Sequence, residues 1–301
     1  MALHSFIAGT PLHVMISLSL IRQLELHDFA KLKIVDYFIG AEDVYRRLLT
    51  LYWEYSAVEV TFFPSHRRAY ADSVKDGTTH LYLDSDTSFQ RHLDLIALKI
   101  ARPNMDIRVF EDGVGSYRTD LYHGKKKRIF EALGLSTYLG GSPFTNAVFV
   151  YEKSRYSKLF PQIRATVIQI EEPLRQTIAR LSNDLNYVFG HHHNYLKSDQ
   201  KCIVYLSSWE VDYDFIESMN NLEGSCFIKL HPHIKSFSSI AGVTELNSRV
   251  PAEIILFDLA NNFSSVDVFH HGSSVEQYVQ AENVHFSKIP ASDVPVPGAA
   301  R

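Results

Sequence analysis

Short runs of β-forming residues alternate with longer amphipathic segments along most of this chain, and this alternation restricts the fold more than any other feature. Residues 5–8 and 33–39 are apolar, strand-like runs, each closed by a glycine. Between them, residues 13–26 place Val14 and Leu18 on one face at helical spacing. Because strands that are separated by helices pair in parallel, the rhythm predicts a doubly wound α/β fold.

The rhythm weakens in the middle of the chain and then resumes. Before this interruption we expect strands over 58–63, 79–83, 106–110 and 147–151, and helices over 41–55, 89–101, 125–133 and 171–184. After it we expect strands over 201–206, 226–230 and 266–269, and helices over 212–219 and 275–281. The 301 residues suffice for two domains. We therefore predict Rossmann-like domains over 1–185 and 186–301, facing each other across a cleft, with a loosely ordered tail over 291–301.

Composition excludes several classes of protein. Thirty basic and thirty-four acidic residues give a net charge of −4, so the whole chain lacks the positive charge typical of nucleic-acid binding. Cys202 and Cys226 are too few to staple the fold and lack zinc-site spacing, which is typical of a reducing compartment. No apolar run reaches the roughly 18–20 residues of a membrane span, and the first residues lack the basic start of a signal peptide. We expect a cytoplasmic protein.

The first candidate site follows the expected strand 106–110. In parallel sheets the loops at the carboxyl ends of the strands contact the ligand. Here that loop is Glu111-Asp112-Gly113. The charge of one carboxylate raises the pKa of its neighbour, which suits a general base, and the glycine permits a tight turn. The alternative is an acidic turn that only solvates the strand end.

The second candidate follows the strand 226–230. Pro232 ends that strand and fixes the backbone of His231, while a protonated His231 and the nearby Lys229 have the charge to neutralise a phosphate. A single histidine in such a place is also commonly a structural residue.

The third candidate is Gly272-Ser273-Ser274, after the strand 266–269. Backbone N–H groups and hydroxyls at the start of a helix form an anion site. The alternative is a serine cap that needs no ligand.

In this order the three motifs resemble those of bacterial sialyltransferases, in particular the group of lipooligosaccharide sialyltransferases and capsular polysialyltransferases. Thr10-Pro11-Leu12 and Pro251-Ala252-Glu253 extend the resemblance, which spans about residues 5–280. No Rossmann fingerprint, P-loop or HExxH motif competes with it. The resemblance implies a GT-B fold and an inverting transfer of sialic acid from CMP-sialic acid to a hydroxyl of a cell-surface glycan, with neither metal nor cofactor.

The resemblance also implies a role for each motif residue. Glu111 is the general base, with Asp112 and Gly113 supporting it, and His231 protonates or hydrogen-bonds the departing CMP phosphate. The other implied residues all bind CMP: Gly272, Ser273 and Ser274 at the phosphate, and Lys229, Pro232 and Glu253 at the ribose and cytidine.

Three alternatives stay open at this point. The first is a transferase for another CMP-activated acidic sugar, either another nonulosonic acid or Kdo. The second is a non-catalytic module that binds a glycan or a nucleotide. The third is a metal site at His191-His192-His193, a run that is more typical of a solvated loop.

A basic cluster, Lys125-Lys126-Lys127-Arg128, has His66-Arg67-Arg68 upstream of it. Such clusters are commonly solvated helix faces. The functional interpretations are contact with anionic lipids at the inner membrane, where a lipid-linked acceptor would lie, or contact with an acidic acceptor.

Overall fold

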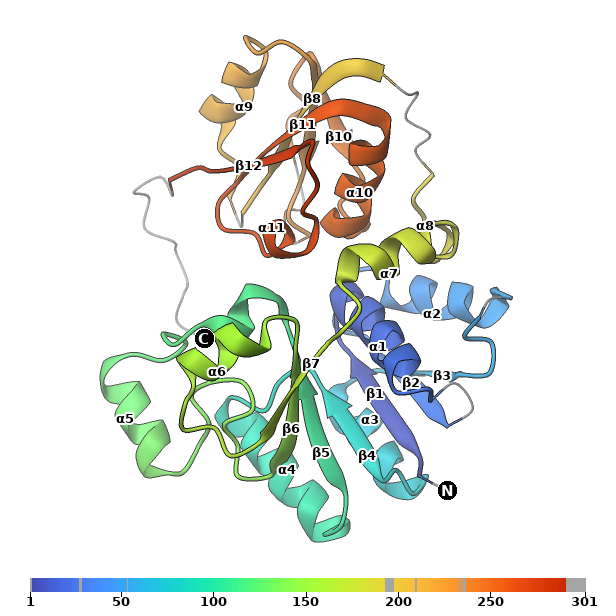
Figure 1. Ribbon diagram of the computed structural model, residues 1–301, viewed down its shortest axis with the longest axis vertical. Coiled ribbons are helices and arrows are strands. Elements are labelled where there is room, and N and C mark those ends of the chain that lie inside the picture. Colours follow the sequence, from blue (N-terminus) through green and yellow to red (C-terminus); the bar gives the residue numbers. More distant parts are fainter. Residues whose placement is uncertain are drawn as a thin grey trace. The chain divides into compact units, whose positions relative to one another are not determined.

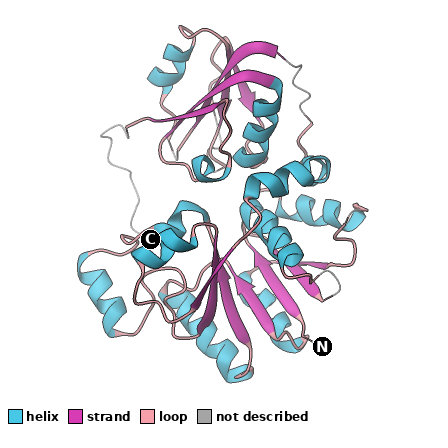
Figure 2. Cartoon of the chain, in the orientation of Figure 1, coloured by secondary structure: helices cyan, strands magenta, loops and turns pink. Residues whose placement is uncertain are grey.

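The computed structural model describes residues 2–26, 29–52, 54–192, 198–208, 210–232, 234 and 237–290. The chain divides into two compact units, Met1–Gly190 and His191–Arg301. Figures 1 and 2 show that each unit is a sheet flanked by helices. The boundary expected between residues 185 and 186 lies inside helix α8 (Ser182–Phe189). The tail 291–301 and His193 lie outside the described residues.

Unit 1 contains a seven-stranded sheet in the order β3-β2-β1-β4-β5-β6-β7. Every pair of neighbouring strands is parallel, as the strand–helix rhythm predicts. The strands are β1 (His4–Ala8), β2 (Ala30–Val35), β3 (Glu59–Phe63), β4 (His80–Leu83), β5 (Asp106–Phe110), β6 (Thr145–Val150) and β7 (Thr166–Gln169).

The helices of unit 1 lie between these strands along the chain, except the last two, which follow β7. They are α1 (Pro11–Gln23), α2 (Ala41–Thr50), α3 (His66–Lys75), α4 (Phe89–Ala101), the 3₁₀ helix η1 (Gly113–Tyr117), α5 (Gly124–Ala132), α6 (Lys153–Leu159), α7 (Leu174–Arg180) and α8. The single helix expected over 171–184 is therefore two helices, which meet at Leu181. Thr10 caps α1 by accepting from the His13 N–H, and Pro11 occupies its first turn.

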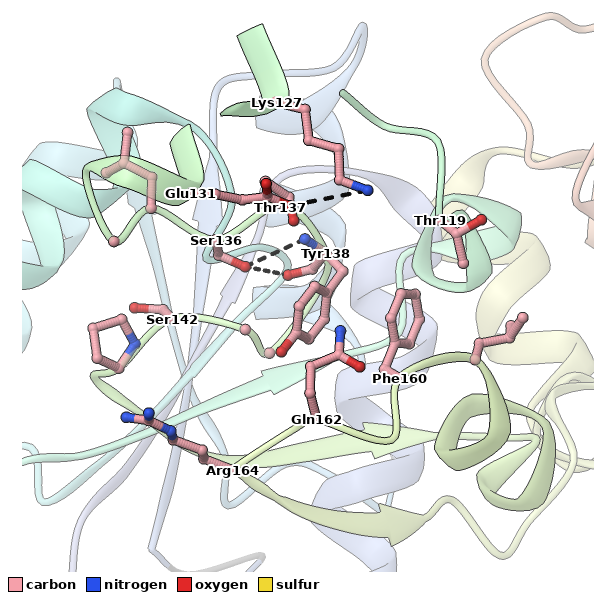
Figure 3. A pocket seen from close by; sticks show the side chains of 16 residues that line it. Thr119, Lys127, Glu131, Ser136, Thr137, Tyr138, Ser142, Phe160, Gln162 and Arg164 are labelled. Carbon is pink, nitrogen blue, oxygen red and sulfur yellow. Dashed lines mark hydrogen bonds and ion pairs between the residues drawn. The ribbon is translucent and has the colours of Figure 1, made fainter. Parts of the chain in front are cut away.

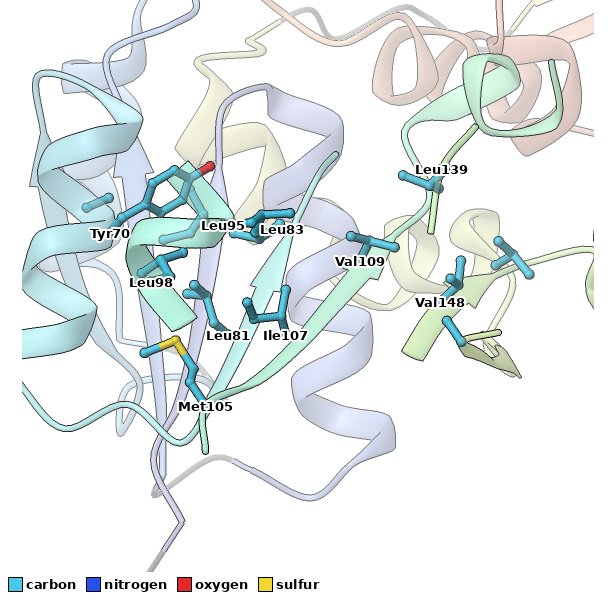
Figure 4. Close-up of a cluster of buried hydrophobic side chains, with 14 of the residues drawn as sticks. Tyr70, Leu81, Leu83, Leu95, Leu98, Met105, Ile107, Val109, Leu139 and Val148 are labelled. Atoms are coloured by element: carbon cyan, nitrogen blue, oxygen red, sulfur yellow. The ribbon is translucent and has the colours of Figure 1, made fainter. Parts of the chain in front are cut away.

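One core cluster of unit 1 lies on one face of the sheet, with residues from β1, β2, β4, β5 and β6, and Figure 4 shows part of it. Leu81, Leu83, Ile107 and Val109 alternate along their strands, so their side chains share that face. Helices α3 and α4 cover part of it. Near β6 the cluster includes Leu139, which belongs to a loop, and Tyr156, which belongs to α6. None of the nine residues of α5, all of them described, is buried. Helix α5 is thus displaced from the place that a crossover helix usually takes.

Unit 2 contains a five-stranded parallel sheet in the order β10-β9-β8-β11-β12. The strands are β8 (Ser198–Leu206), β9 (Ser225–Lys229), β10 (Val243–Leu246), β11 (Phe263–His270) and β12 (Val284–Lys288). The helices are α9 (Tyr213–Met219), α10 (Ala252–Asn262) and α11 (Val275–Tyr278). Sequence periodicity did not identify the edge strands β10 and β12, because each is short and contains several polar residues.

The longest helices, α1 and α4, have thirteen residues each, and no helix in the described part of the chain is both long and apolar enough to cross a bilayer. Cys202 and Cys226 are buried free thiols in the sheet of unit 2.

Candidate functional site

The carboxyl ends of β1, β4 and β5 are neighbours in the sheet of unit 1, and each is followed by residues with reactive side chains. His13 lies in the first turn of α1, Asp84 directly follows β4, and Glu111 and Asp112 directly follow β5. This is the edge of a parallel sheet at which ligands bind.

Glu111 lies beneath the surface at this edge, with none of its area exposed. Its carboxylate accepts a hydrogen bond from the hydroxyl of Tyr117 in η1. It also accepts one, at 2.8 Å, from the backbone N–H of Tyr151, the residue that follows β6. Burial and then the charge of Glu111 raise the pKa of the Tyr117 hydroxyl, which stays a donor. Glu111 thereby ties η1 and the end of β6 to β5. Its role as a base stays a prediction.

Asp112 is the exposed carboxylate of the pair, with 51% of its side chain accessible. Its Oδ1 lies 2.8 Å from Nε2 of His13. The Gly9 N–H donates a hydrogen bond to Nδ1 of His13 at 3.2 Å. In the neutral ring the proton is therefore on Nε2, and this N–H donates a hydrogen bond to Asp112. His13 itself is buried. The sequence offered one unused signal for His13, which directly follows the Thr10-Pro11-Leu12 motif.

Opposite charges shift both pKa values of this pair. Burial alone would lower the pKa of His13, but Asp112 and Asp84 outweigh burial and raise it. Burial alone would raise the pKa of Asp112, but the charge and hydrogen bond of His13 outweigh it and lower the pKa. We predicted a raised pKa within the carboxylate pair from like-charge repulsion. For Asp112 the direction is the opposite, because a histidine contacts it.

Asp86 is fully enclosed and organises a loop. Its carboxylate accepts from the Gly140 N–H at 2.8 Å, the Ser142 N–H at 3.0 Å and the Thr145 hydroxyl at 2.8 Å. Across the residues that the structure describes, no group of three or more His, Cys, Asp or Glu side chains converges in a way that would hold a metal ion. Both oxygens of Asp86 are occupied by the protein itself.

In unit 2, His231 follows β9 as predicted, and its backbone N–H donates to Oγ of Ser207, beyond β8, at 2.7 Å. Lys229 and Glu253 are both buried. Nζ of Lys229 donates to the Ser248 carbonyl at 3.2 Å. Burial lowers the pKa of Lys229 to about 8, against the opposing charge of Glu253. Burial raises the pKa of Glu253, against the charge of Lys229. Their contact with a nucleotide stays a prediction.

The Gly272-Ser273-Ser274 turn follows β11 and is held by a residue that the sequence did not single out. Nδ1 of buried His270 accepts from the Gly272 N–H at 3.0 Å and the Ser273 N–H at 2.9 Å. Oγ of Ser273 accepts from the Val275 N–H at 3.3 Å. Two N–H groups expected to bind a phosphate therefore point at His270, and α11 has only four residues instead of the seven expected. For an anion, the turn offers mainly the serine hydroxyls.

His191 does not lie in a solvated loop as expected. It is buried, and its Nε2 lies 3.0 Å from Oδ2 of Asp258 in α10. His191 is therefore a structural residue in unit 2.

Two solved structures have a fold similar to that of this chain. An α/β-galactoside α-2,3-sialyltransferase from the luminous marine bacterium Photobacterium phosphoreum superposes with a TM-score of 0.60 at 12% identity, covering 97% of this chain and 92% of its own. A UDP-N-acetylglucosamine 2-epimerase from Rickettsia bellii superposes with a TM-score of 0.57 at 10% identity, covering 95% and 78%. No family model and no curated protein matches the chain. The fold is GT-B-like, as in these two structures, and at such low identity the likeness extends to the fold alone.

Proposed function

We propose that the protein is an inverting, metal-independent sialyltransferase that moves sialic acid from CMP-sialic acid to a hydroxyl of a cell-surface glycan. One observation carries the proposal. In a GT-B-like fold, the three motifs of the resemblance all follow carboxyl ends of parallel strands, namely β5, β9 and β11. The acidic motif belongs to unit 1, and the His-Pro and Ser-Ser motifs belong to unit 2.

The reaction needs two contributions from the protein. The anomeric carbon of sialic acid is tertiary and bears a carboxylate, so the bond to CMP is largely broken in the transition state. The acceptor oxygen forms the new bond from the opposite face, its proton passes to a base, and CMP leaves with the bonding electron pair. A positioned base contributes about 10²–10⁴-fold in rate, and donors fixed on the phosphate contribute comparable or larger factors.

We assign the base to the Glu111–Asp112 pair. The resemblance names Glu111 for this role, but an acceptor hydroxyl must reach the base, and only Asp112 exposes its side chain in the conformation described. We therefore assign proton transfer to Asp112, positioned by His13, and the anchoring of the loop to Glu111. The lowered pKa of Asp112 keeps its carboxylate ionised at neutral pH, and it also makes Asp112 a weaker base than a carboxylate with a raised pKa.

On the donor side we propose that His231 donates to the leaving phosphate. Ser273 and Ser274 supply hydroxyl donors to the same phosphate, because the neighbouring N–H groups are engaged by His270. Glu253, with Lys229 and Pro232, is proposed at the ribose and cytidine.

The test is incubation with CMP-sialic acid or CMP-Kdo and a panel of lactose-, N-acetyllactosamine- and oligosialic-terminated acceptors, followed by mass and linkage analysis. We expect sialylated products. Products from CMP-Kdo alone would establish the alternative sugar, and CMP binding without turnover of either donor would establish a non-catalytic module.

We also propose that the outer face of α5 contacts the anionic lipids of the inner membrane at its cytoplasmic side. Lys125, Lys126 and Arg128 are exposed, and beside them Ile129 and Leu133 expose 58% and 60% of their area. Each basic residue contributes about 1 kcal/mol at an anionic surface, and apolar neighbours insert among the headgroups. The proposed lipid contact does not include the basic residues of α3, because Arg67 there pairs with Asp94 of α4 at 3.2 Å.

Vesicle co-sedimentation tests this contact. Reversing Lys125 and Lys126 to Glu should weaken binding to vesicles that contain phosphatidylglycerol by about 30-fold or more, since about 2 kcal/mol is lost. The matched control reverses Arg46 and Lys75, which are exposed cations of α2 and α3. Equal losses in both variants would exclude α5 as the specific contact.

A further inference from the structure

Unit 1 contains a cavity that none of the proposed roles uses. Its volume is about 620 Å³, within the range of about 300–1,000 Å³ that is typical of ligand sites. The side chains that line it come from α5, from the loops on either side of that helix and from the segment before β7 (Figure 3). Those used in the argument are Thr119, Lys127, Ser136, Tyr138, Gln162 and Arg164.

The loop that forms the cavity wall is rigidly built. Asp86 holds it through Gly140, Ser142 and Thr145, as described above. A Cβ at Gly141 would lie 2.5 Å from Oγ of Ser136 and 2.8 Å from the ring of Tyr138, so only glycine fits there. The wall is therefore preorganised, which lowers the entropic cost of binding a ligand.

An aromatic ring occupies the middle of this wall. Tyr138 stacks on Phe160 with ring centroids 4.7 Å apart and planes 10° apart. Figure 3 shows the Tyr138 ring central in the cavity with its hydroxyl toward Gln162. A sugar ring has an apolar C–H face that packs on an aromatic ring, and hydroxyls that need amide and hydroxyl partners. Gln162 and Thr119, both exposed, are such partners.

Two cations flank the ring. Lys127, from α5, lies 4.0 Å from Glu131, and the exposed Arg164 lies at the opposite side of the cavity in Figure 3. The planar guanidinium of an arginine pairs well with a carboxylate. The cavity therefore suits a sugar chain that carries an acidic residue better than a neutral one.

The cavity also follows the proposed base along the chain. Helix η1 begins at Gly113, directly after Asp112, and Thr119 lies two residues beyond its end. We propose that this cavity binds the inner sugars of an acidic oligosaccharide acceptor while the terminal sugar reaches Asp112. This inference rests on the proposed function, because it concerns the acceptor of that reaction.

Binding and kinetics test the inference separately. Calorimetric titration without donor uses oligosialic acid, a neutral oligosaccharide of equal length and a disaccharide. The variants are Arg164→Ala and Thr119→Trp, which change exposed side chains, and the control is Arg46→Ala in α2, whose side chain is 71% exposed. Because a charge-assisted hydrogen bond is lost, Arg164→Ala should bind oligosialic acid about tenfold more weakly than the wild type. Thr119→Trp should abolish binding, and the control should bind as wild type.

In transfer assays, both variants should raise KM for the long acidic acceptor about tenfold, leaving kcat and the KM of a disaccharide acceptor unchanged. Equal changes for long and short acceptors, or wild-type binding by both variants, would overturn the inference. If no sialic acid is transferred but oligosialic acid still binds through Arg164, the proposed function fails and the glycan site stands. If sialic acid is transferred but both variants bind oligosialic acid as the wild type does, the proposed function stands and the glycan site in this cavity fails.

Discussion

The substitution Asp112→Asn removes proton-accepting capacity from the exposed carboxylate while preserving its shape. The asparagine carbonyl oxygen can still accept from Nε2–H of His13, which lies 2.8 Å from Oδ1 of Asp112. Because the side chain is half exposed, the lost charge should change the free energy of unfolding by less than about 1 kcal/mol. Removal of a general base should lower kcat about 10²–10⁴-fold, or about 2.7–5.4 kcal/mol in activation free energy.

Two further variants make this measurement specific. In Glu111→Gln the carbonyl oxygen can replace Oε2, which accepts from both the Tyr117 hydroxyl and the Tyr151 N–H. The NH2 group then enters the buried place of the other carboxylate oxygen, and this added donor should destabilise unit 1 by about 1–3 kcal/mol. Asp120→Asn changes a carboxylate of similar exposure in the same loop and should leave kcat unchanged. Initial rates with saturating CMP-sialic acid and acceptor give kcat, and thermal melting gives stability.

The acid limb of the pH profile supplies an independent readout. His13 lowers the pKa of Asp112, so His13→Gln should shift the acid limb of kcat/KM to higher pH. Near wild-type turnover by Asp112→Asn, together with a loss of 10²-fold or more in Glu111→Gln, would refute the reasoning from exposure and assign the base to Glu111.

Four other outcomes are expected. Ser273→Ala with Ser274→Ala should weaken CMP by about 1–3 kcal/mol in calorimetry while cytidine binds unchanged, since hydrogen bonds to a charged group are lost; equal affinity for both ligands would make the serines a cap only. EDTA should leave transfer intact, and loss of activity that Mg²⁺ restores would overturn the metal-free mechanism. His13 has a raised pKa when folded, so its stabilisation is complete below its unfolded pKa of about 6.5 and is lost as the pH rises through the folded value; the melting temperature of the wild type should fall between about pH 6 and pH 9 more than that of His13→Gln. Lys33→Met should destabilise unit 1 by about 3–5 kcal/mol in denaturant unfolding, because the buried Lys33 ammonium donates to two aspartates and a serine at 2.9 Å each; a loss under about 1 kcal/mol would contradict this.

Local signals in the sequence were sufficient for the architecture. The two periodicities, with a glycine or proline that closes some of the runs, predicted parallel α/β units, and strand β5 appears over the residues expected. The motif loops lie at carboxyl ends of strands because a loop must follow wherever a strand stops. The short edge strand β10 has no clear hydrophobic periodicity in the sequence. It is a strand because it pairs with β9, and this pairing is not visible in its composition.

Tertiary structure decided which of the adjacent residues are accessible and what they contact. Glu111 and Asp112 are adjacent carboxylates that the sequence alone does not distinguish. Tyr151, forty residues away, contacts the buried Glu111, whereas His13, ninety-nine residues away, contacts the exposed Asp112. In the same way His270 takes the N–H groups of the Ser273 turn. Burial and hydrogen bonding depend on which distant segments pack together, and hydrophobic periodicity carries no information about such pairings.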